Sequence, residues 1–258
     1  MTATLKDGKG YALDAPAEGS PTPTLHLYDV IGEDLLGGIA ARQVVADLAA
    51  LGKVEALDVR INSPGGDVFE GIALYNALAR FPAKVTVHID GIAASIASLI
   101  ALAGDKTLIA ENAMVMVHRP WTAVLGDAEQ LRHHADSLDK AWTAMLATYA
   151  RGTGRRAETF AQRVVKAGGE WWLTAEEAVA EGFADGVEKP AKQAQVFGLS
   201  RFHRVPERLA ARATDSAPAP VAHLAVAEIA APRVERASAP GTSAAARRRV
   251  VDVLRLAT

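Results

Sequence analysis

The sequence predicts an α/β domain between Leu25 and Lys189. Strand-like and helix-like periodicities alternate along this stretch, which is typical of α/β folds. The order strand, turn, helix, strand also occurs twice in succession. The chain has 258 residues, of which 50% are hydrophobic and 22% charged, enough for one sizeable domain with further segments outside it.

The first of these repeated units covers residues 57–89. Leu57, Val59 and Ile61 alternate as a strand that stops at the turn Asn-Ser-Pro-Gly-Gly. A helix is expected over 68–81, because its apolar residues are three positions apart and Pro82 ends it. The next strand is expected over 85–89.

The other elements follow from the same reasoning. The second unit continues from Gly91 into a helix of small residues. The expected elements outside the first unit are a strand over 25–30, a helix over 40–51, a helix over 93–103, strands over 107–109 and 114–117, and a helix over 174–182. Thr174 and Glu177 have the spacing of a capping box for the last of these.

A long amphipathic helix is expected over 127–149. Leu131, Leu138 and Met145 recur in it at seven-residue spacing. Two interpretations stay open, namely packing against the core and projection towards another subunit.

Both ends of the chain differ from the domain in composition. Residues 1–24 are rich in Gly, Pro, Thr and Ala, and a flexible segment is expected there. Residues 190–258 carry 11 Lys and Arg against 5 Asp and Glu and are rich in Ala and Pro, so a basic, disordered tail is expected. Within it, Ser243–Ala257 could form an amphipathic docking helix, or the tail could be solvated without a partner.

Composition excludes several classes of protein. The chain has no Cys, so disulfide frameworks, thiol nucleophiles and zinc fingers are excluded. The apolar stretch Gly91–Gly104 has 14 residues, fewer than the roughly 20 that cross a bilayer, and no secretory signal is recognisable, so a cytoplasmic protein is expected. No GxxxxGK[ST] loop is present, and neither cofactor nor metal is expected. Nucleic-acid binding by the domain is not expected.

Two short motifs are candidates for chemistry. The glycine pair Gly65 and Gly66 lies between a strand and a helix, where backbone N–H groups can face a bound oxygen, although such turns are often merely tight. Ser95 begins a helix of small residues, and a helix N-terminus favours the negative charge that develops when a serine attacks a carbonyl.

A serine nucleophile needs a general base, and His118 is the best placed of the seven histidines. It ends the apolar strand 114–117, and strand ends are where α/β sheets place their sites. A purely structural histidine at a strand end is the alternative. His133 and His134 are expected to be solvated, and Ser98 to be a packing residue.

Four ordered motifs, INSPGGDVFEGIALYNAL, DGIAASIAS, MVMVHRP and EWWLTAEEAVAEGFAD, resemble those of the Clp protease proteolytic subunit family. The chain looks closest to the family's phage-borne branch, the head maturation (prohead) proteases. The resemblance covers about Leu25–Lys189. It implies a ClpP/crotonase-like fold of repeated ββα-type units with a long projecting helix.

The resemblance also implies a serine endopeptidase that forms homo-oligomeric rings and cleaves protein substrates. Ser95 matches the family's nucleophile and His118 its general base. Glu170 stands where the family usually has the Asp of the triad, which is a departure. The oxyanion-hole N–H groups map onto Gly65 and Ile96.

Several functions are compatible with this resemblance. A head maturation protease would cut scaffold and capsid precursors, in the host cytoplasm or within the prohead, without ATP. A housekeeping subunit would instead work with an ATPase unfoldase. A crotonase-like coenzyme A enzyme and an inactive scaffold protein are the alternatives of other classes.

Overall fold

The structure, a computed structural model, describes residues 10–16, 22–34 and 37–189. All of them belong to the first of two units of the chain, Met1–Ala217. The second unit, Pro218–Thr258, lies outside the described residues. So do the expected basic tail over 190–258 and its terminal helix.

The described residues form strands and helices in alternation, which confirms the expected α/β class. The strands are β1 (Tyr11–Asp14), β2 (Thr24–Leu27), β3 (Gly32–Asp34), β4 (Gly37–Ile39), β5 (Ala56–Ser63), β6 (Lys84–Ala94), β7 (Lys106–Ala110), β8 (Met114–His118), β9 (Glu170–Leu173) and β10 (Gly186–Glu188). The helices are α1 (Ala41–Ala50), α2 (Val68–Ala79), α3 (Ile96–Ile100), α4 (Ala128–Thr153), α5 (Ala157–Lys166) and α6 (Ala175–Ala180).

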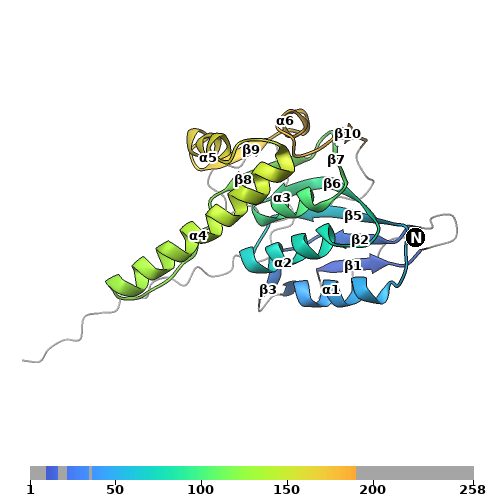
Figure 1. Ribbon diagram of the computed structural model, residues 1–258, viewed down its shortest axis with the longest axis horizontal. Helices are drawn as coiled ribbons and strands as arrows, with labels where there is room; N and C mark the ends of the chain where they lie inside the picture. Colours follow the sequence, from blue (N-terminus) through green and yellow to red (C-terminus); the bar gives the residue numbers. More distant parts are fainter. Residues whose placement is uncertain (1–9, 17–21, 35–36, 190–258) are drawn as a thin grey trace, which may run out of the picture. The chain divides into compact units, whose positions relative to one another are not determined.

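The main sheet has the strand order β1-β2-β5-β6-β7-β10 (Figure 1). All neighbours from β2 to β10 are parallel, and β1 is antiparallel to β2. The long strand β6 changes its partner along its length. Its residues 86–89 pair with β7, whereas residues 92–94 pair in parallel with β8, which is antiparallel to β9.

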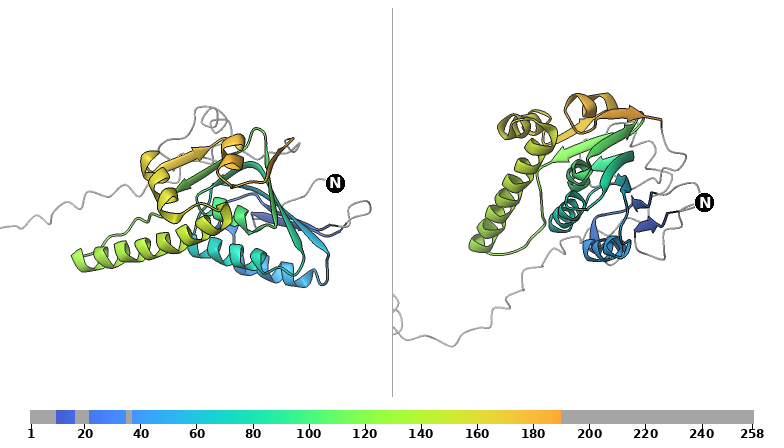
Figure 2. Two further views of the ribbon diagram at one scale, coloured as in Figure 1. Left: turned by 45° about the horizontal axis from the view of Figure 1, so that its top comes forward. Right: turned by 45° about the vertical axis from the view of Figure 1, so that its right-hand side comes forward.

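Helices α1, α2 and α3 lie along one face of the sheet (Figure 2). Leu57, Val59 and Ile61 of β5 are at most 1% exposed. They join the buried sides of these helices in one hydrophobic cluster. Alternation along β5 therefore separates a buried apolar set of residues from a polar set on the other face of the sheet.

One member of this polar set, Arg60, forms an ion pair with a buried carboxylate on the neighbouring strand β6. The guanidinium of Arg60 donates two hydrogen bonds to the carboxylate of Asp90, with Nε 2.8 Å from Oδ2. The hydroxyl of Tyr28 donates a third hydrogen bond to the same carboxylate. The side chain of Asp90 is 1% exposed and that of Arg60 24%. This group joins β5 to β6 five residues before Ser95, close to where β6 changes partner.

Packing against the core, one of the two interpretations of the long helix, is correct for its second half, whereas projection towards another subunit stays a prediction. A capping box between Asp127 and Gln130 starts α4, and Gly154 in the left-handed conformation ends it. The side chains of its first half are largely exposed, and Leu131 is 44% exposed. Its second half is anchored by Trp142, Met145 and Tyr149, and Figure 1 shows the first half extending away from the sheet.

Several elements differ from the expectations, and β3, β4, β9 and β10 are among the strands that were not expected. The sheet begins at β1, ahead of the expected domain start at Leu25, and α5 was not expected. The helix expected over 93–103 begins only at Ile96. The reason is that residues 92–94 pair with β8, so sheet pairing overrides the helix propensity of alanine. Within the described ranges, no helix is both long and apolar enough to span a membrane.

Candidate active site

Ser95 occupies a strained turn between β6 and α3. Its φ is 54° and its ψ is −130°, and it is the one non-glycine residue with positive φ among those that the structure describes. Its N–H donates to the carbonyl of Met116 at 2.9 Å, which ties the turn to β8. Such a conformation costs about 1–3 kcal/mol and persists where the surroundings impose it, often at active sites.

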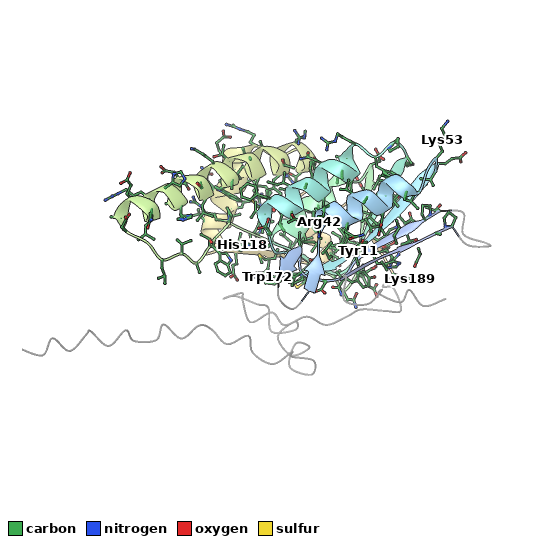
Figure 3. The ribbon with its side chains drawn as sticks, turned by 90° about the horizontal axis from the view of Figure 1, so that it is seen from below. Tyr11, Arg42, Lys53, His118, Trp172 and Lys189 are labelled. Atoms are coloured by element: carbon green, nitrogen blue, oxygen red, sulfur yellow. The ribbon has the colours of Figure 1, made fainter. Side chains whose placement is uncertain are left out.

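His118 ends β8 beside this turn. Because β6 and β8 are parallel where they pair, their C-terminal ends lie at the same edge of the sheet. Nε2 of His118 is 2.7 Å from Oγ of Ser95. The imidazole is largely buried, with 8% of the residue exposed. Figure 3 labels His118 and, beside it, Trp172 of the paired strand β9. The distance between Nε2 and Oγ is the hydrogen-bonding distance that a general base and a serine nucleophile would need.

Glu170 lies directly across from His118 in the antiparallel pair β8–β9. Opposite residues in such a ladder have Cβ atoms roughly 4.5–5.5 Å apart, so their side chains interact. The structure thus brings together the three residues that the sequence analysis selected from segments far apart in the chain.

The electrostatics of the site keep His118 able to accept a proton. Burial lowers the pKa of His118 below its ordinary value, while the charge of Glu170 acts in the opposite direction and raises it. The burial effect is the larger, so the imidazole is neutral at neutral pH. A neutral imidazole can act as a general base.

Replacing Glu170 by Gln is expected to move the acid limb of the pH–rate profile to lower pH. The substitution removes the charge that raises the pKa of His118, so the imidazole stays neutral at lower pH. The maximal rate is expected to fall about 10²-fold or more, because the imidazolium loses its partner. The pH dependence of peptide hydrolysis measures both effects. Glu170→Asp keeps the charge and should hold the acid limb near that of the wild type; an acid limb that Glu170→Gln leaves in place would contradict this role.

Gly65 lies against Ser95, the expected nucleophile. Its φ is +86°, and a Cβ placed on it would lie 2.5 Å from Cβ of Ser95 and 3.2 Å from the nitrogen of Ile96. The backbone of Gly65 and the N–H of Ile96, which begins α3, are therefore neighbours beside Ser95. The first N–H groups of a helix lack partners within it, so that of Ile96 can face a ligand.

The role of Gly65 in an oxyanion hole stays a prediction. In the structure its N–H donates to Oγ of Ser63 at 3.2 Å, and that hydroxyl donates to the carbonyl of Asp29 at 2.6 Å. An oxyanion held by Gly65 would have to replace this long hydrogen bond. Ser63 was given no role in the sequence analysis, because a hydrogen bond between a side chain and the backbone of the same turn produces no recognisable residue spacing.

Gly65→Ala is expected to reduce turnover about 10²-fold, since displacing reacting groups by about 1 Å has that effect. The added methyl would lie 2.6 Å from the carbonyl oxygen of Ala94 and would push the turn of Ser95 out of place. Gly52→Ala is the matched control: its φ is +69°, but nothing lies within 4 Å of the added Cβ. Activities and Tm values of both variants test this, and equal turnover in the two would contradict it.

The other histidines of the described residues lie away from Ser95. His26 and His88 are on β2 and β6, where their rings contact Asp14 and Glu188. His133 and His134 are exposed on α4, as expected. Within the described ranges, no group of three or more His, Asp and Glu is placed to hold a metal ion.

The family model for Clp protease matches residues 31–191. The chain belongs to the Clp protease family. The expected ClpP-like fold and family are thereby confirmed, and the match ends close to the expected end of the domain at Lys189.

Individual relatives agree with this assignment. An ATP-dependent Clp protease proteolytic subunit from Leuconostoc citreum is 31% identical over 162 residues, which is 58% of this chain and 80% of the relative. The same subunit from Ligilactobacillus salivarius is 29% identical over 165 residues, or 63% of this chain and 81% of the relative. Among solved structures, a ClpP1 mutant from Listeria monocytogenes has a TM-score of 0.56 at 22% identity, covering 64% of this chain and 91% of that chain.

Proposed function

We propose that this chain is a serine endopeptidase in which Ser95 is the nucleophile, His118 the general base and Glu170 the acid that supports the imidazolium. The observation that carries the proposal is the distance of 2.7 Å between Nε2 of His118 and Oγ of Ser95. It is found at a strained turn in a chain of the Clp protease family.

The mechanism is acyl transfer to serine and then to water. Oγ of Ser95 attacks the peptide carbonyl carbon while its proton passes to Nε2 of His118. The carbonyl oxygen becomes an oxyanion beside the N–H groups of Gly65 and Ile96. His118 then gives the proton to the leaving amine, and the C–N bond breaks. Water, deprotonated by the same imidazole, attacks the acyl-enzyme and releases the new carboxyl end.

Within this activity, the role we propose is head maturation, in which scaffold and capsid precursors of a phage or prophage are cleaved. Its support is the composition of the chain's ends. The basic, Ala/Pro-rich segment 190–258 lies almost wholly beyond the family match, and suits a packaging or self-cleaved extension. The exposed first half of α4 suits contact with further copies of the chain in a ring.

The second candidate is a proteolytic subunit that depends on an ATPase unfoldase. The relatives of this chain favour it, because those named above are ATP-dependent Clp protease subunits. In that case folded substrates would be degraded only with the ATPase and ATP present.

The Ser–His contact weighs against the functions of other classes. A crotonase-like coenzyme A enzyme stabilises its intermediate with paired backbone N–H groups, and needs neither an activated serine nor a histidine beside it. An inactive scaffold would have no need of a strained serine within 2.7 Å of a largely buried imidazole.

Intact-mass spectrometry of the full chain distinguishes the two proteolytic roles. Wild type and Ser95→Ala are each incubated with a capsid precursor, then with a folded substrate plus an unfoldase and ATP. Head maturation predicts trimming of the capsid precursor, or of the chain's own ends, by the wild type alone without ATP. Cleavage that requires the unfoldase and ATP would overturn that role and support the second candidate.

A further inference from the structure

The carbonyl oxygen of Ser95 is held by two buried hydroxyl groups. The hydroxyl of Ser98 donates to it at 2.6 Å, in addition to the N–H of Ser98 at 3.1 Å. The hydroxyl of Tyr149 lies 3.4 Å from the same oxygen and 2.8 Å from Oγ of Ser98. Both residues are 0% exposed, so water does not compete for these bonds.

The number of available protons decides which of these hydroxyl groups donates and which accepts. Ser98 has one hydroxyl proton, which goes to the carbonyl of Ser95. Tyr149 must therefore donate, either to Oγ of Ser98 or to that carbonyl. Burial raises the pKa of the Tyr149 hydroxyl above its ordinary value, so it stays protonated and remains a donor.

The ring of Tyr149 is itself held in place. It stacks on Phe160 of α5 with centroids 4.7 Å apart and meets Phe183 edge-on at 6.0 Å. Phe160 in turn contacts Trp171, the neighbour of Glu170 on β9. A rigid aromatic cluster thus supports the hydroxyl that reaches the turn of Ser95.

Holding this carbonyl has a consequence for the other side of the same peptide bond. The peptide that joins Ser95 to Ile96 is planar and trans, so its C=O and N–H point in opposite directions. Fixing the oxygen towards Ser98 and Tyr149 therefore fixes the direction of the N–H of Ile96. The torsion that sets the plane of this peptide is ψ of Ser95, which is −130°.

We propose that Ser98 and Tyr149 are positioning residues, which orient the Ser95–Ile96 peptide so that Oγ of Ser95 and the N–H of Ile96 face the substrate carbonyl together. The proposal rests on the proposed serine endopeptidase function. Neither residue touches substrate; both act through the backbone of Ser95.

The test uses the full chain and a fluorophosphonate probe that reacts with activated serines. The maximal rate of inactivation and the half-saturating probe concentration are measured separately for wild type, Ser98→Ala, Tyr149→Phe and the double variant. We expect the maximal rate to fall about 10-fold in Ser98→Ala and about 100-fold in the double variant, with the half-saturating concentration unchanged.

Thr107→Val is the matched control. Its hydroxyl is also buried and donates at 2.9 Å to the carbonyl of Ala101, the first residue of the 3-10 turn that follows α3. It should leave the maximal rate unchanged, with a loss in Tm similar to that of Ser98→Ala. An equal fall in rate in Thr107→Val, or wild-type rates in the double variant, would overturn the positioning role. If the wild type itself fails to react at Ser95, the proposed function fails, and this inference with it.

Discussion

Ser95→Ala is expected to reduce peptide hydrolysis about 10⁴-fold or more while leaving the fold intact. Removing the nucleophile of a serine protease eliminates the covalent route, and only the weak acceleration from binding and the oxyanion hole remains. The Tm should change little, because Ala keeps the β-carbon of the turn and the hydroxyl that is lost contacts the partly exposed site through His118. Initial rates on a peptide substrate, with Tm measured in parallel, check both statements.

Ser137→Ala is the control for this experiment. Ser137 is exposed on α4, where its hydroxyl donates to the backbone carbonyl of His133 at 2.9 Å. Its loss should change neither rate nor Tm. Retention of hydrolysis in Ser95→Ala would assign the activity to another residue or to a contaminant, and would contradict the proposed nucleophile.

Asp90→Asn is expected to be the most destabilising of the substitutions considered, by about 2–4 kcal/mol. Breaking a buried ion pair leaves the remaining charge without compensation, which typically costs about 3–5 kcal/mol; partial exposure of Arg60 reduces the value here. Asn keeps the shape of the side chain, so the loss in the free energy of unfolding comes from the missing charge and from its weakened hydrogen bonds with Arg60 and Tyr28. Urea unfolding of wild type and variant measures it.

The exposed pair Arg119–Asp139 is the matched control for this prediction. Its side chains are 55% and 69% exposed, although its N···O distance is 2.6 Å. Exposed pairs contribute little to stability because solvent screens them. Asp139→Asn should leave the unfolding midpoint unchanged, and a loss of stability equal to that of Asp90→Asn would contradict the importance of burial.

Periodicity identified most of the sheet and its helices. Apolar residues recur at every second position in a strand with one buried face, and at every third or fourth position in a helix. The alternation of Leu57, Val59 and Ile61 reflects one buried face of β5, and the helix expected over 68–81 is α2 at 68–79. Turn chemistry was informative for the same reason: Thr174 and Glu177 form the expected capping box. Local rules of this kind act within a few residues and can be found in one sequence.

Elements that depend on distant partners were not predictable in this way. β1 is stabilised by pairing with β2, and β6 extends through Ala94 because β8 lies beside it. The charged group of Tyr28, Arg60 and Asp90 joins three separate segments, and nothing in their spacing indicates it.

In the candidate site, too, local patterns could be predicted and contacts between distant residues could not. Ser95, His118 and Gly65 were selected from their places at a helix start, a strand end and a glycine turn. The resemblance to the family added Glu170 and Ile96. The contact of Tyr149 with the turn of Ser95 spans 54 residues and was not expected. Ser98 was interpreted as a packing residue, because it lies one turn after Ser95 in the expected helix. Contacts made by a distant side chain to the backbone leave no pattern in one sequence.

Mapping the site of fluorophosphonate modification tests the central claim, that Ser95 is a nucleophile activated by His118. Full-length wild type and His118→Ala are treated with the probe, digested, and the modified residue is located by mass spectrometry. The account predicts one adduct on Ser95 in the wild type, and labelling at least about 10²-fold slower in His118→Ala, because the base is missing. An adduct on another serine, no adduct at all, or equal labelling in His118→Ala would contradict it.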